Sequence, residues 1–377
     1  MGGAPKECRN AADRGACRMG RRRAARPGPF RLGATSRVPQ SGGVIASVEF
    51  RNFKALRAAR LELAPFNLVL GPNGSGKTSL IEALVRLGAL ARLPLAVPSD
   101  PAGRRARADG PQIAFHFHPP HEALTARLGC VSELVCDLLE IEPAGAPGWP
   151  ALRASLEHVR SYTFDAAAMA LPVPRSAGAE LAPHGGNLAA VLLRLQTDAP
   201  AEFAALAAEA LRIMPEFSRF DLAVLPGDRV ELALLLADEP AGGRVTAENL
   251  SQGTLALLAL LALAFHPSPP SLVCLEEIDH GIHPRLLREV RDLCYRLSYP
   301  ASFGGARPPV QVVATTHSPY LLDLVREHPE EVVLSQKHGA AAHFERLVDR
   351  ADLGELLRDG SLGDLWYSGI LGGVPEE

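Results

Sequence analysis

A glycine-rich segment, GPNGSGKTS, constrains this chain more than any other feature. Gly71, Gly76, Lys77 and Thr78 match the phosphate-loop pattern, in which two glycines enclose four residues and are followed by Lys and then Ser or Thr. The members of the segment are Gly71, Pro72, Asn73, Gly74, Ser75, Gly76, Lys77, Thr78 and Ser79. Because glycines allow backbone N–H groups to turn inward on an anion, the segment predicts a loop that binds phosphate groups.

The residues on both sides of this loop favour the same interpretation. The apolar run Phe66–Leu70 predicts a strand before it, and residues 78–92 have the apolar spacing of a helix after it. A helix N-terminus adds a dipole that favours negative charge. We therefore expect Lys77 to reach the β- and γ-phosphates of a nucleotide and the Thr78 hydroxyl to hold Mg²⁺. The alternative is a glycine-rich turn that matches by chance, and the flanking strand and helix argue against it.

A second segment, Leu272–Glu277, is an apolar run that ends in two carboxylates. This is typical of a buried parallel strand whose polar residues lie at its carboxyl end, where α/β sheets bind ligands. We expect Glu276 to complete the Mg²⁺ shell and Glu277 to orient or deprotonate the attacking water. The alternative is a strand that merely ends at the surface in charged residues.

A third segment contains Ser251 and Gly253 directly before the apolar helix predicted over Leu255–Phe265. A Ser-x-Gly turn that opens a helix is a second anion site. A single phosphate-loop domain has no use for a second γ-phosphate site, whereas a dimer has, because Ser251 can then face the nucleotide of the other subunit. The alternative is an ordinary cap, in which Ser251 only satisfies the helix N-terminus.

The fourth segment, Val310–Pro319, predicts a strand that carries His317 to its carboxyl end, where the imidazole can hydrogen-bond the γ-phosphate. A single histidine after a strand is more often structural than catalytic. The order of the four segments decides between these interpretations: a glycine loop, a Ser-x-Gly turn, a strand with two glutamates, and a strand that ends in histidine.

This order resembles the ABC-type ATPases and, among them, the SMC/RecF/OLD-like branch with its compact ATPases of the AAA_21 type. The resemblance covers almost all of residues 45–373. Besides the four segments, the stretches that carry it are IASVEFRNF at 45–53, GGNLAAVL at 185–192, EEIDHGIHP at 276–284 and LGDLWYSGILGG at 362–373. It implies an α/β fold, namely a P-loop NTPase of the ABC-type head class with an antiparallel β lobe and a short helical insert.

The resemblance also implies ATP and Mg²⁺ as ligands and an ATP-dependent head-to-head dimer. It marks Lys77 and Thr78 as Walker A residues, Glu276 and Glu277 as Walker B residues, Ser251 as the signature serine, Asp279 as the D-loop acid and His317 as the switch histidine. The chain departs from the family pattern in its signature, SQGT in place of SGGQ, and in having Ile278 after the two glutamates, where relatives commonly have Pro. No glutamine can be assigned to the Mg²⁺-sensing position, for which Gln112 is the nearest candidate.

The chain has 377 residues, of which 47% are hydrophobic and 21% charged, as in globular proteins. Its longest apolar stretch, Leu255–Phe265, is too short to span a bilayer, so no membrane partner is expected. Six cysteines show no CxxC spacing, so neither a zinc site nor a disulfide framework is indicated, and a reducing cytoplasm is the expected location.

Residues 1–43 differ in kind from the rest, with ten Lys or Arg and two acidic residues. A transit peptide and a basic arm that binds nucleic acid are two interpretations. We favour a disordered extension, which translation from a start codon upstream of the true one would explain, because the family pattern begins only at Ile45. The remaining chain has a formal net charge of −11, which disfavours a surface that binds DNA throughout.

Along the chain, we expect one ATPase domain over residues 44–377. Its core is split between 44–92 and 250–335, the lobe and helical insert occupy 93–249, and a C-terminal appendage covers 336–377. Strands are predicted at 45–50, 60–63 and 66–70, in the lobe at 112–118 and 132–142, and with a further one within 152–165. A helix is predicted over 198–214, and a hairpin joins strands 219–225 and 229–236.

The leading functional interpretation is an ATP-binding and ATP-hydrolysing switch that dimerises around ATP and signals to a partner, which is an effector protein, a nuclease or DNA. The alternative is a RecF-like ATPase of DNA repair or recombination that binds DNA directly. The long insert and the C-terminal appendage argue against a transporter subunit, and the intact Glu277 argues against a module that does not hydrolyse ATP.

Overall fold

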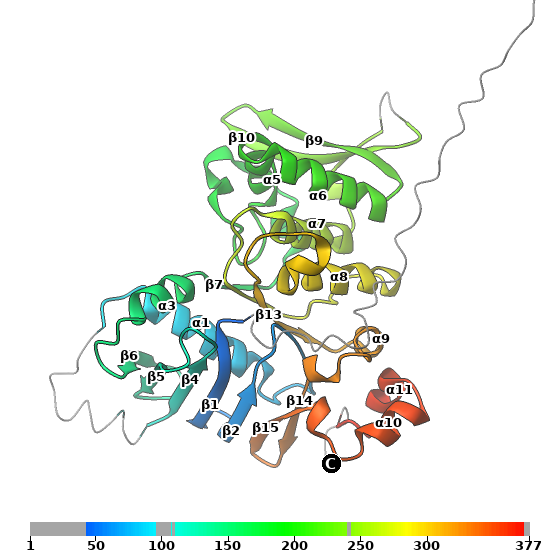
Figure 1. The fold of residues 1–377 in the computed structure, drawn as a ribbon. Coiled ribbons are helices and arrows are strands. Elements are labelled where there is room, and N and C mark those ends of the chain that lie inside the picture. The colour runs from blue at the N-terminus through cyan, green and yellow to red at the C-terminus, as the bar shows by residue number, and fades with distance from the viewer. Residues whose placement is uncertain (1–42, 96–106, 108–109, 240–242, 373–377) are drawn as a thin grey trace, which may run out of the picture. The chain divides into compact units, whose positions relative to one another are not determined.

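A six-stranded sheet with the order β15-β14-β3-β13-β12-β7 forms the centre of the fold (Figure 1). Its strands are β3 (Phe66–Leu70), β7 (Val159–Tyr162), β12 (Leu272–Leu275), β13 (Gln311–Thr316), β14 (Val332–His338) and β15 (Ala341–Arg346). All neighbours pair in parallel except β14 and β15. The computed structural model describes residues 43–95, 107, 110–239 and 243–372. The predicted extension over residues 1–43 therefore lies outside the described residues apart from Gly43.

The central strands form where the sequence is continuously apolar. Every residue of β3, β12 and β13 is buried, as expected for parallel strands covered on both faces. The two buried amides among them are satisfied. Gln311 bonds both the N–H and the carbonyl of Ile45, at 2.9 and 2.8 Å, and Asn67 donates to the carbonyls of Ala64 and Val312. These bonds fix the start of β13 and β3 in the sheet.

The antiparallel lobe, predicted within 93–249, is a five-stranded sheet with the order β2-β1-β4-β5-β6. It therefore includes β1 and β2, which were predicted in the core segment 44–92. Its strands are β1 (Ile45–Phe53), β2 (Leu56–Glu62), β4 (Gln112–Phe117), β5 (Thr125–Cys130) and β6 (Cys136–Glu142). The sequence did not indicate β5, and the strand predicted from residue 132 begins only at Cys136, because the turn between β5 and β6 occupies residues 131–135.

The strand expected within residues 152–165 does not belong to the lobe. Residues up to Leu156 form the helix α3 (Trp149–Leu156), and β7 pairs in parallel with β12 in the central sheet. The central sheet thus extends beyond the predicted core segments 44–92 and 250–335. It includes β7 at 159–162, and through β14 and β15 it continues to residue 346. The domain boundaries remain a prediction, but the core is divided into more pieces than the sequence indicated.

The phosphate-loop helix α1 (Lys77–Ala91) lies between the lobe sheet and the central sheet (Figure 1). A single cluster of buried side chains unites the three elements, with Leu80, Leu84 and Leu87 of α1 fully buried between residues such as Phe115 of the lobe and Val313 of the central sheet. The loop that precedes α1 is therefore attached to the best-packed part of the molecule.

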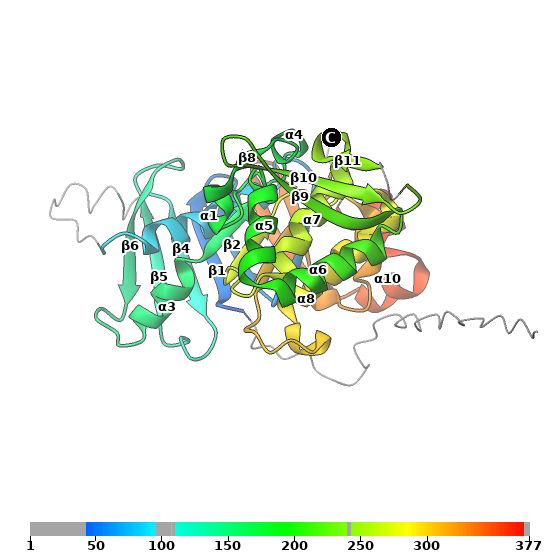
Figure 2. The same cartoon turned by 90° about the horizontal axis from the view of Figure 1, so that it is seen from above.

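The helical insert contains α5 (Leu188–Asp198) and α6 (Pro200–Ile213), which lie alongside the strands β9 (Phe217–Leu225) and β10 (Arg229–Leu236) (Figure 2). The predicted hairpin of β9 and β10 is confirmed. The helix predicted over 198–214 is α6, and α5, which precedes it, was not predicted. The strands β8 (Val173–Pro174) and β11 (Arg244–Thr246) pair with β10. The short helix α4 (Ala166–Met169) and the 3₁₀ turns at 175–179 and 247–249 complete this region.

The helix α7 (Gln252–Phe265) is buried on all sides, as its apolar sequence predicts. It packs against α4, α5, α6 and α8 (Leu287–Ser298). The C-terminal helices α10 (Leu353–Asp359) and α11 (Leu362–Tyr367) follow η6 (Leu347–Asp349). α11 packs on α9 (Pro319–Leu324), where the Gly363 N–H donates to Asp323 at 3.0 Å. The 3₁₀ turns η3 (Pro284–Leu286), η4 (Pro300–Phe303) and η5 (Pro329–Glu331) lie in connecting segments.

A disulfide joins Cys130 at the end of β5 to Cys136 at the start of β6. The prediction that no disulfide is indicated is therefore wrong for this pair. The two cysteines are partners in the strand register, which could not be seen while β5 was unrecognised. Cys274 and Cys294 are buried thiols whose pKa is raised by burial. Among the described residues, no helix is long and apolar enough to cross a membrane.

A fully buried carboxylate, Glu331, anchors α8 to the turn before β14. The hydroxyls of Tyr295 and Tyr299 each donate to it at 2.6 Å. Burial raises the pKa of Glu331 to about 7, although the two tyrosine hydrogen bonds and the nearby His328 oppose the shift. The carboxyl group thus binds a proton more tightly in the folded protein than in the unfolded chain.

Glu331→Gln should change how stability depends on pH. The raised pKa of Glu331 contributes stability that is complete below about pH 4.5 and is lost as the pH rises through about 7. Because the variant lacks this decline, its free energy of unfolding relative to that of the wild type should rise by on the order of 2 kcal/mol between pH 5 and pH 8. Urea denaturation at several pH values measures the difference.

Glu330→Gln is the matched control for this experiment. Burial raises the pKa of Glu330, but the hydrogen bond with His328, a backbone hydrogen bond and the charges of His328 and Arg346 together outweigh it, so the net shift is downward. Its contribution to stability is therefore lost as the pH falls, which is the opposite direction. A parallel pH trend in the two variants would contradict the role given to Glu331.

Candidate functional site

The glycine loop takes a backbone shape that only glycine adopts without strain. Gly74 and Gly76 have φ angles of 76° and 105°, in the left-handed region. Gly71 is packed so closely that a Cβ there would lie 2.3 Å from the Ser335 carbonyl oxygen. The Ser335 hydroxyl in turn donates to the Ser75 carbonyl at 2.6 Å. The loop is therefore packed closely against β14.

Lys77, the first residue of α1, lies buried at the base of this loop. Its Nζ donates to the carbonyls of Gly71 and Pro72, at 2.6 and 2.9 Å. Burial lowers the pKa of Lys77 to about 8, and the charge of Glu277 opposes the shift. The ammonium group has no carboxylate in hydrogen-bond contact among the described residues, so an anion in the loop would supply its missing counter-charge.

Glu276 follows β12 directly and faces the loop. Its pKa is raised by burial, then by the negative charges of Glu277 and Glu82, while a hydrogen bond from the Thr163 side chain opposes the shift. Glu82 is paired with Lys54 and Arg86, so only Glu276 and Glu277 line the cavity beside the loop. Two carboxylates of like charge there favour a cation next to them. Thr78 is exposed at the first turn of α1, with its hydroxyl available beside this position.

Glu277 has a strained backbone, with a φ angle of 47°. A non-glycine residue in this region costs about 1–2 kcal/mol, which the surroundings must offset. Its N–H donates to the Thr315 hydroxyl at 2.9 Å, and the N–H of Ile278 donates to the Thr315 carbonyl at 3.0 Å. The turn therefore leaves the strand direction and presents the Glu277 carboxylate to solvent, where His280 lies 3.8 Å from it.

His317 and Asp279 meet beside Glu277. The Thr316 hydroxyl donates to Asp279 at 2.5 Å and also accepts the N–H of Ser318 at 2.9 Å, so it fixes the residues on both sides of His317. The pKa of His317 is lowered by burial and by the charge of Lys77, against the charges of Asp279 and Glu277. At neutral pH the imidazole is therefore held in its neutral form, which can donate one hydrogen bond and accept another.

Most of the predicted site residues line one cavity of about 140 Å³. Its lining consists of Asn73, Gly74, Gly76, Lys77, Thr78, Ser79, Glu276, Glu277, Thr315 and His317. A second depression, lined by Asn73, Glu277, Asp279, His280 and His317, adjoins it. The open glycine loop with a buried ammonium group fits a polyphosphate, and the crowded carboxylates beside Thr78 fit Mg²⁺.

Ser251 and Gly253 are not part of either lining among the described residues. The Ser251 hydroxyl caps α7, accepting the N–H of Thr254 at 3.1 Å and meeting the Thr254 hydroxyl at 2.8 Å. A Cβ on Gly253 would lie 2.7 Å from the Gly281 carbonyl, so the turn packs tightly on the loop that follows Asp279. The cap predicted as the alternative for Ser251 is present, and the serine remains exposed.

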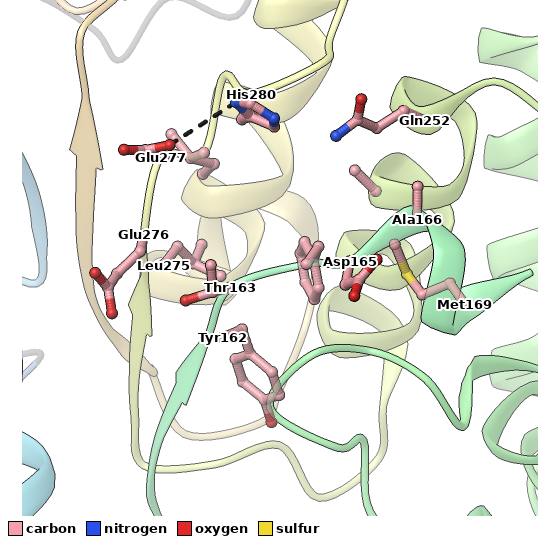
Figure 3. A pocket seen from close by; sticks show the side chains of 13 residues that line it. Tyr162, Thr163, Asp165, Ala166, Met169, Gln252, Leu275, Glu276, Glu277 and His280 are labelled. Carbon is pink, nitrogen blue, oxygen red and sulfur yellow. Dashed lines mark ion pairs between the residues drawn. The ribbon is translucent and has the colours of Figure 1, made fainter.

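A larger cavity of about 360 Å³ lies on the other side of the two glutamates (Figure 3). Tyr162, Asp165 and Met169 line it opposite Gln252 of α7, and the Glu276 carboxylate points away from Asp165 and Met169. This cavity links the carboxyl end of β7 to the start of α7, but it does not contain the glycine loop.

The residue that follows β7 is a site residue that the sequence did not indicate. Thr163 hydrogen-bonds Glu276, because Tyr162 and Leu275 are partners in the register of β7 and β12. Gln112, the candidate for the Mg²⁺ sensor, begins β4 in the lobe and does not line the cavity. The assignment of Gln112 as the Mg²⁺ sensor is therefore not supported. Thr163 could be predicted only from recognition of β7 as a strand of the central sheet.

The fold and the cavity together define a P-loop ATPase of the SMC/RecF type. The chain belongs to the AAA_21 family, described as "AAA domain, putative AbiEii toxin, Type IV TA system", whose family model matches residues 66–323. The resemblance inferred from the four sequence segments is therefore confirmed, as is the fold class.

Short stretches are similar to the DNA replication and repair protein RecF. The identity is 60% over 38 residues with RecF of Haemophilus ducreyi, which is 10% of this chain and 11% of that protein. It is 43% over 67 residues with RecF of Pectobacterium atrosepticum, which is 18% of each chain. The chain thus matches less than a fifth of the length of these relatives.

The fold is similar to that of SMC head domains. A crystal structure of an Smc head bound to the C-winged helix domain of ScpA has a TM-score of 0.53 and 15% identity, over 80% of this chain and 97% of that chain. The Smc head of Pyrococcus furiosus, bound to the C-terminal domain of ScpA, has a TM-score of 0.51 and 14% identity, over 84% and 100%. At this identity, the likeness concerns the fold alone.

The lowered pKa of Lys77 predicts that the affinity of this site for a nucleotide depends on pH. Because the ammonium form is lost above about pH 8, the affinity for ATP without Mg²⁺ should fall about tenfold between pH 7 and pH 9. Lys77→Arg, which stays charged throughout this range, should bind more weakly at pH 7 but show no such fall. Titration with a fluorescent ATP analogue measures both, and an equal pH trend in the two proteins would show that Lys77 does not meet the phosphates.

Proposed function

We propose that this protein is an ATP-binding and ATP-hydrolysing switch that dimerises around ATP and signals to a partner. The observation that supports it most is the single cavity that Lys77, Thr78, Glu276, Glu277 and His317 line together, although they come from three separate parts of the chain. Membership of an ATPase family supports the same conclusion.

Each residue of the cavity has a role that its surroundings support. The N–H groups of the glycine loop and the Lys77 ammonium would bind the β- and γ-phosphates, and Thr78 with Glu276 would hold Mg²⁺, which supplies charge neutralisation for phosphoryl transfer. Glu277, exposed and turned away from the strand, would orient the attacking water and accept its proton. His317, neutral and next to Lys77, would donate a hydrogen bond to the γ-phosphate.

The dimer part of the proposal is supported by the position of Ser251. The turn that carries it lies outside the cavity of its own chain, yet it is exposed, opens a buried fourteen-residue helix and packs on the loop after Asp279. A second subunit arranged head to head would bring Ser251 to the nucleotide of the first, and the N-terminus of α7 would face its γ-phosphate.

The partner that we propose is a protein. Smc heads similar in fold are bound to ScpA domains, which favours a protein partner for this chain as well. The similarity to RecF keeps direct DNA binding as the second candidate. The formal net charge of −11 for residues 44–377 favours the protein partner, because a DNA-coating surface is basic.

Glu277→Gln should bind ATP like the wild type, hydrolyse it at least a hundredfold more slowly and accumulate as a dimer, since only the group that activates water is lost. Gel filtration with and without Mg·ATP, together with a phosphate-release assay, measures this. Turnover at the wild-type rate would remove Glu277 from the mechanism, and a monomer with ATP bound would contradict the dimer.

Mixing two inactive variants tests whether Ser251 acts on the nucleotide of the partner. Ser251→Arg should spare ATP binding by the monomer and block dimerisation, while Lys77→Ala should not bind ATP. In a mixed dimer one of the two sites carries both defects and the other carries neither, so ATPase activity should return in part on mixing. Failure to recover activity, with mixed dimers demonstrated by cross-linking, would leave Ser251 as a helix cap alone.

A further inference from the structure

The cavity of about 360 Å³ takes no part in the proposed nucleotide site, although it adjoins the same two glutamates (Figure 3). Its walls come from three places in the chain, namely the end of β7 with α4, the first turns of α7, and the turn that follows β12. Its volume lies within the range of about 300–1,000 Å³ that is typical of ligand pockets. The cavity is therefore large enough for a ligand of its own.

The greater part of the lining is apolar. The apolar side chains that contribute to it are Phe164, Ala166, Met169, Ala256, Leu275 and Ile278. Phe164 and Ala166 are half-buried and keep accessible surface, while the other four are buried behind them. An apolar group that enters the cavity would remove both its own surface and that of Phe164 and Ala166 from water, which favours binding.

The exposed part of the lining is polar and carries negative charge. Its members are Thr163, Asp165, Gln252, Glu277 and His280. Asp165 caps α4, where Oδ1 accepts the N–H groups of Ala167 and Ala168 at 2.9 and 3.3 Å, so its carboxylate is fixed in place. Among the described residues, no Lys or Arg lines the cavity, and the His280 imidazole lies 3.8 Å from Glu277. The rim therefore favours a ligand that carries positive charge next to its apolar group.

This combination decides between classes of ligand. A nucleic acid would bring its phosphates next to Asp165 and Glu277, and like charges repel. A cation alone would leave the apolar lining uncovered. A protein segment offers an apolar side chain and basic neighbours together. The formal net charge of −11 for residues 44–377 adds a long-range attraction for a basic segment.

The cavity shares a wall with the nucleotide cavity. Glu276 and Glu277 line both of them. Thr163, on the rim of the larger cavity, hydrogen-bonds Glu276. A ligand in the larger cavity would therefore contact the residues to which we assign the binding of Mg²⁺ and the activation of water.

We propose that the larger cavity is a docking pocket for an apolar side chain in a basic segment of a partner protein. The apolar side chain packs against Phe164 and Ala166, and a neighbouring Lys or Arg pairs with Asp165. The inference rests on the proposed function, since it names the chemistry of the partner to which the switch signals.

Full-length protein labelled with ¹³C-methyl methionine tests the proposal by NMR. The chain has four methionines, of which Met169 lines the cavity and Met214, which follows α6, does not. Acetyl-Lys-Phe-Lys-amide should move the Met169 methyl resonance to saturation and leave that of Met214 unchanged, and Met169→Leu assigns the signal. Acetyl-Glu-Phe-Glu-amide and acetyl-Lys-Ala-Lys-amide should bind about fivefold more weakly, because the first has the wrong charge and the second lacks the apolar group.

Two variants with matched controls locate the peptide. Ala166→Leu fills the cavity and should abolish the Met169 shift, whereas Ala167→Leu adds the same side chain at the next, exposed position outside the lining and should respond like the wild type. Asp165→Asn keeps the oxygen that caps α4 but loses the charge, so the peptide should bind about threefold more weakly. Asp228→Asn removes an exposed carboxylate in the turn between β9 and β10 and should leave the affinity unchanged.

Binding of a fluorescent ATP analogue, measured on the same samples, separates the two proposals. A wild type in which the basic peptide moves Met169 but which binds no ATP would overturn the switch and leave the docking pocket. Equal peptide affinities of wild type and Ala166→Leu, or a Met169 resonance that no peptide moves, would overturn the pocket alone. A Met169 resonance that moves with oligothymidylate, or on dilution of the protein without peptide, would also overturn it, because the occupant would then be DNA or a second copy of this chain.

Discussion

The parallel pairing of β3, β13, β12 and β7 determines where the site residues that directly follow these strands lie. The register makes Leu70 a partner of Thr316, and Leu275 a partner of both Ala314 and Tyr162. The residues that follow these strands, Gly71, His317, Glu276 and Thr163, therefore emerge at one edge of the sheet. Backbone hydrogen bonds between continuous apolar strands hold them there, and the buried amides of Asn67 and Gln311 fix the other edge. Site geometry is thus a consequence of core packing, because no side chain of the site needs to hold the strands together.

The same arrangement leaves the site electrostatically unbalanced. Lys77 and His317 have lowered pKa values and Glu276 has a raised one, so each group is shifted toward its neutral form, and burial is the first cause in all three. A core that served stability alone would pair these charges with one another. Here the ammonium bonds only carbonyls, and the carboxylates repel one another. An anion on Lys77 and a cation beside Glu276 would reverse the pKa shifts of all three groups. A site preorganised for charged ligands differs in this way from a structural ion pair, whose charges are already balanced.

The sequence was informative where one physical signal dominated. Buried strands such as β12 and β13 are continuously apolar, and the glycines at 71, 74 and 76 are required by close contact or positive φ, so both could be predicted. The errors occur where the signal is tertiary. β7 has only four residues, and its place beside β12 depends on pairing across more than a hundred residues, so Thr163 could not be recognised. The disulfide of Cys130 and Cys136 depends on a strand that was missed. The strain at Glu277 is set by Thr315 and leaves no mark in the local sequence.

In the proposed dimer, Ser251 would cap its own helix and also serve the other subunit. A serine hydroxyl has two lone pairs and one proton. At Ser251 one lone pair accepts the Thr254 N–H, and the Thr254 hydroxyl lies 2.8 Å away. If the threonine hydroxyl donates, both lone pairs of Ser251 are occupied and its proton is left to point outward. A γ-phosphate oxygen needs such a donor. In the proposed dimer, the threonine in SQGT, a departure from SGGQ, would act as a positioning residue that aims the Ser251 proton. Capping and binding across the dimer would then use different parts of one hydroxyl.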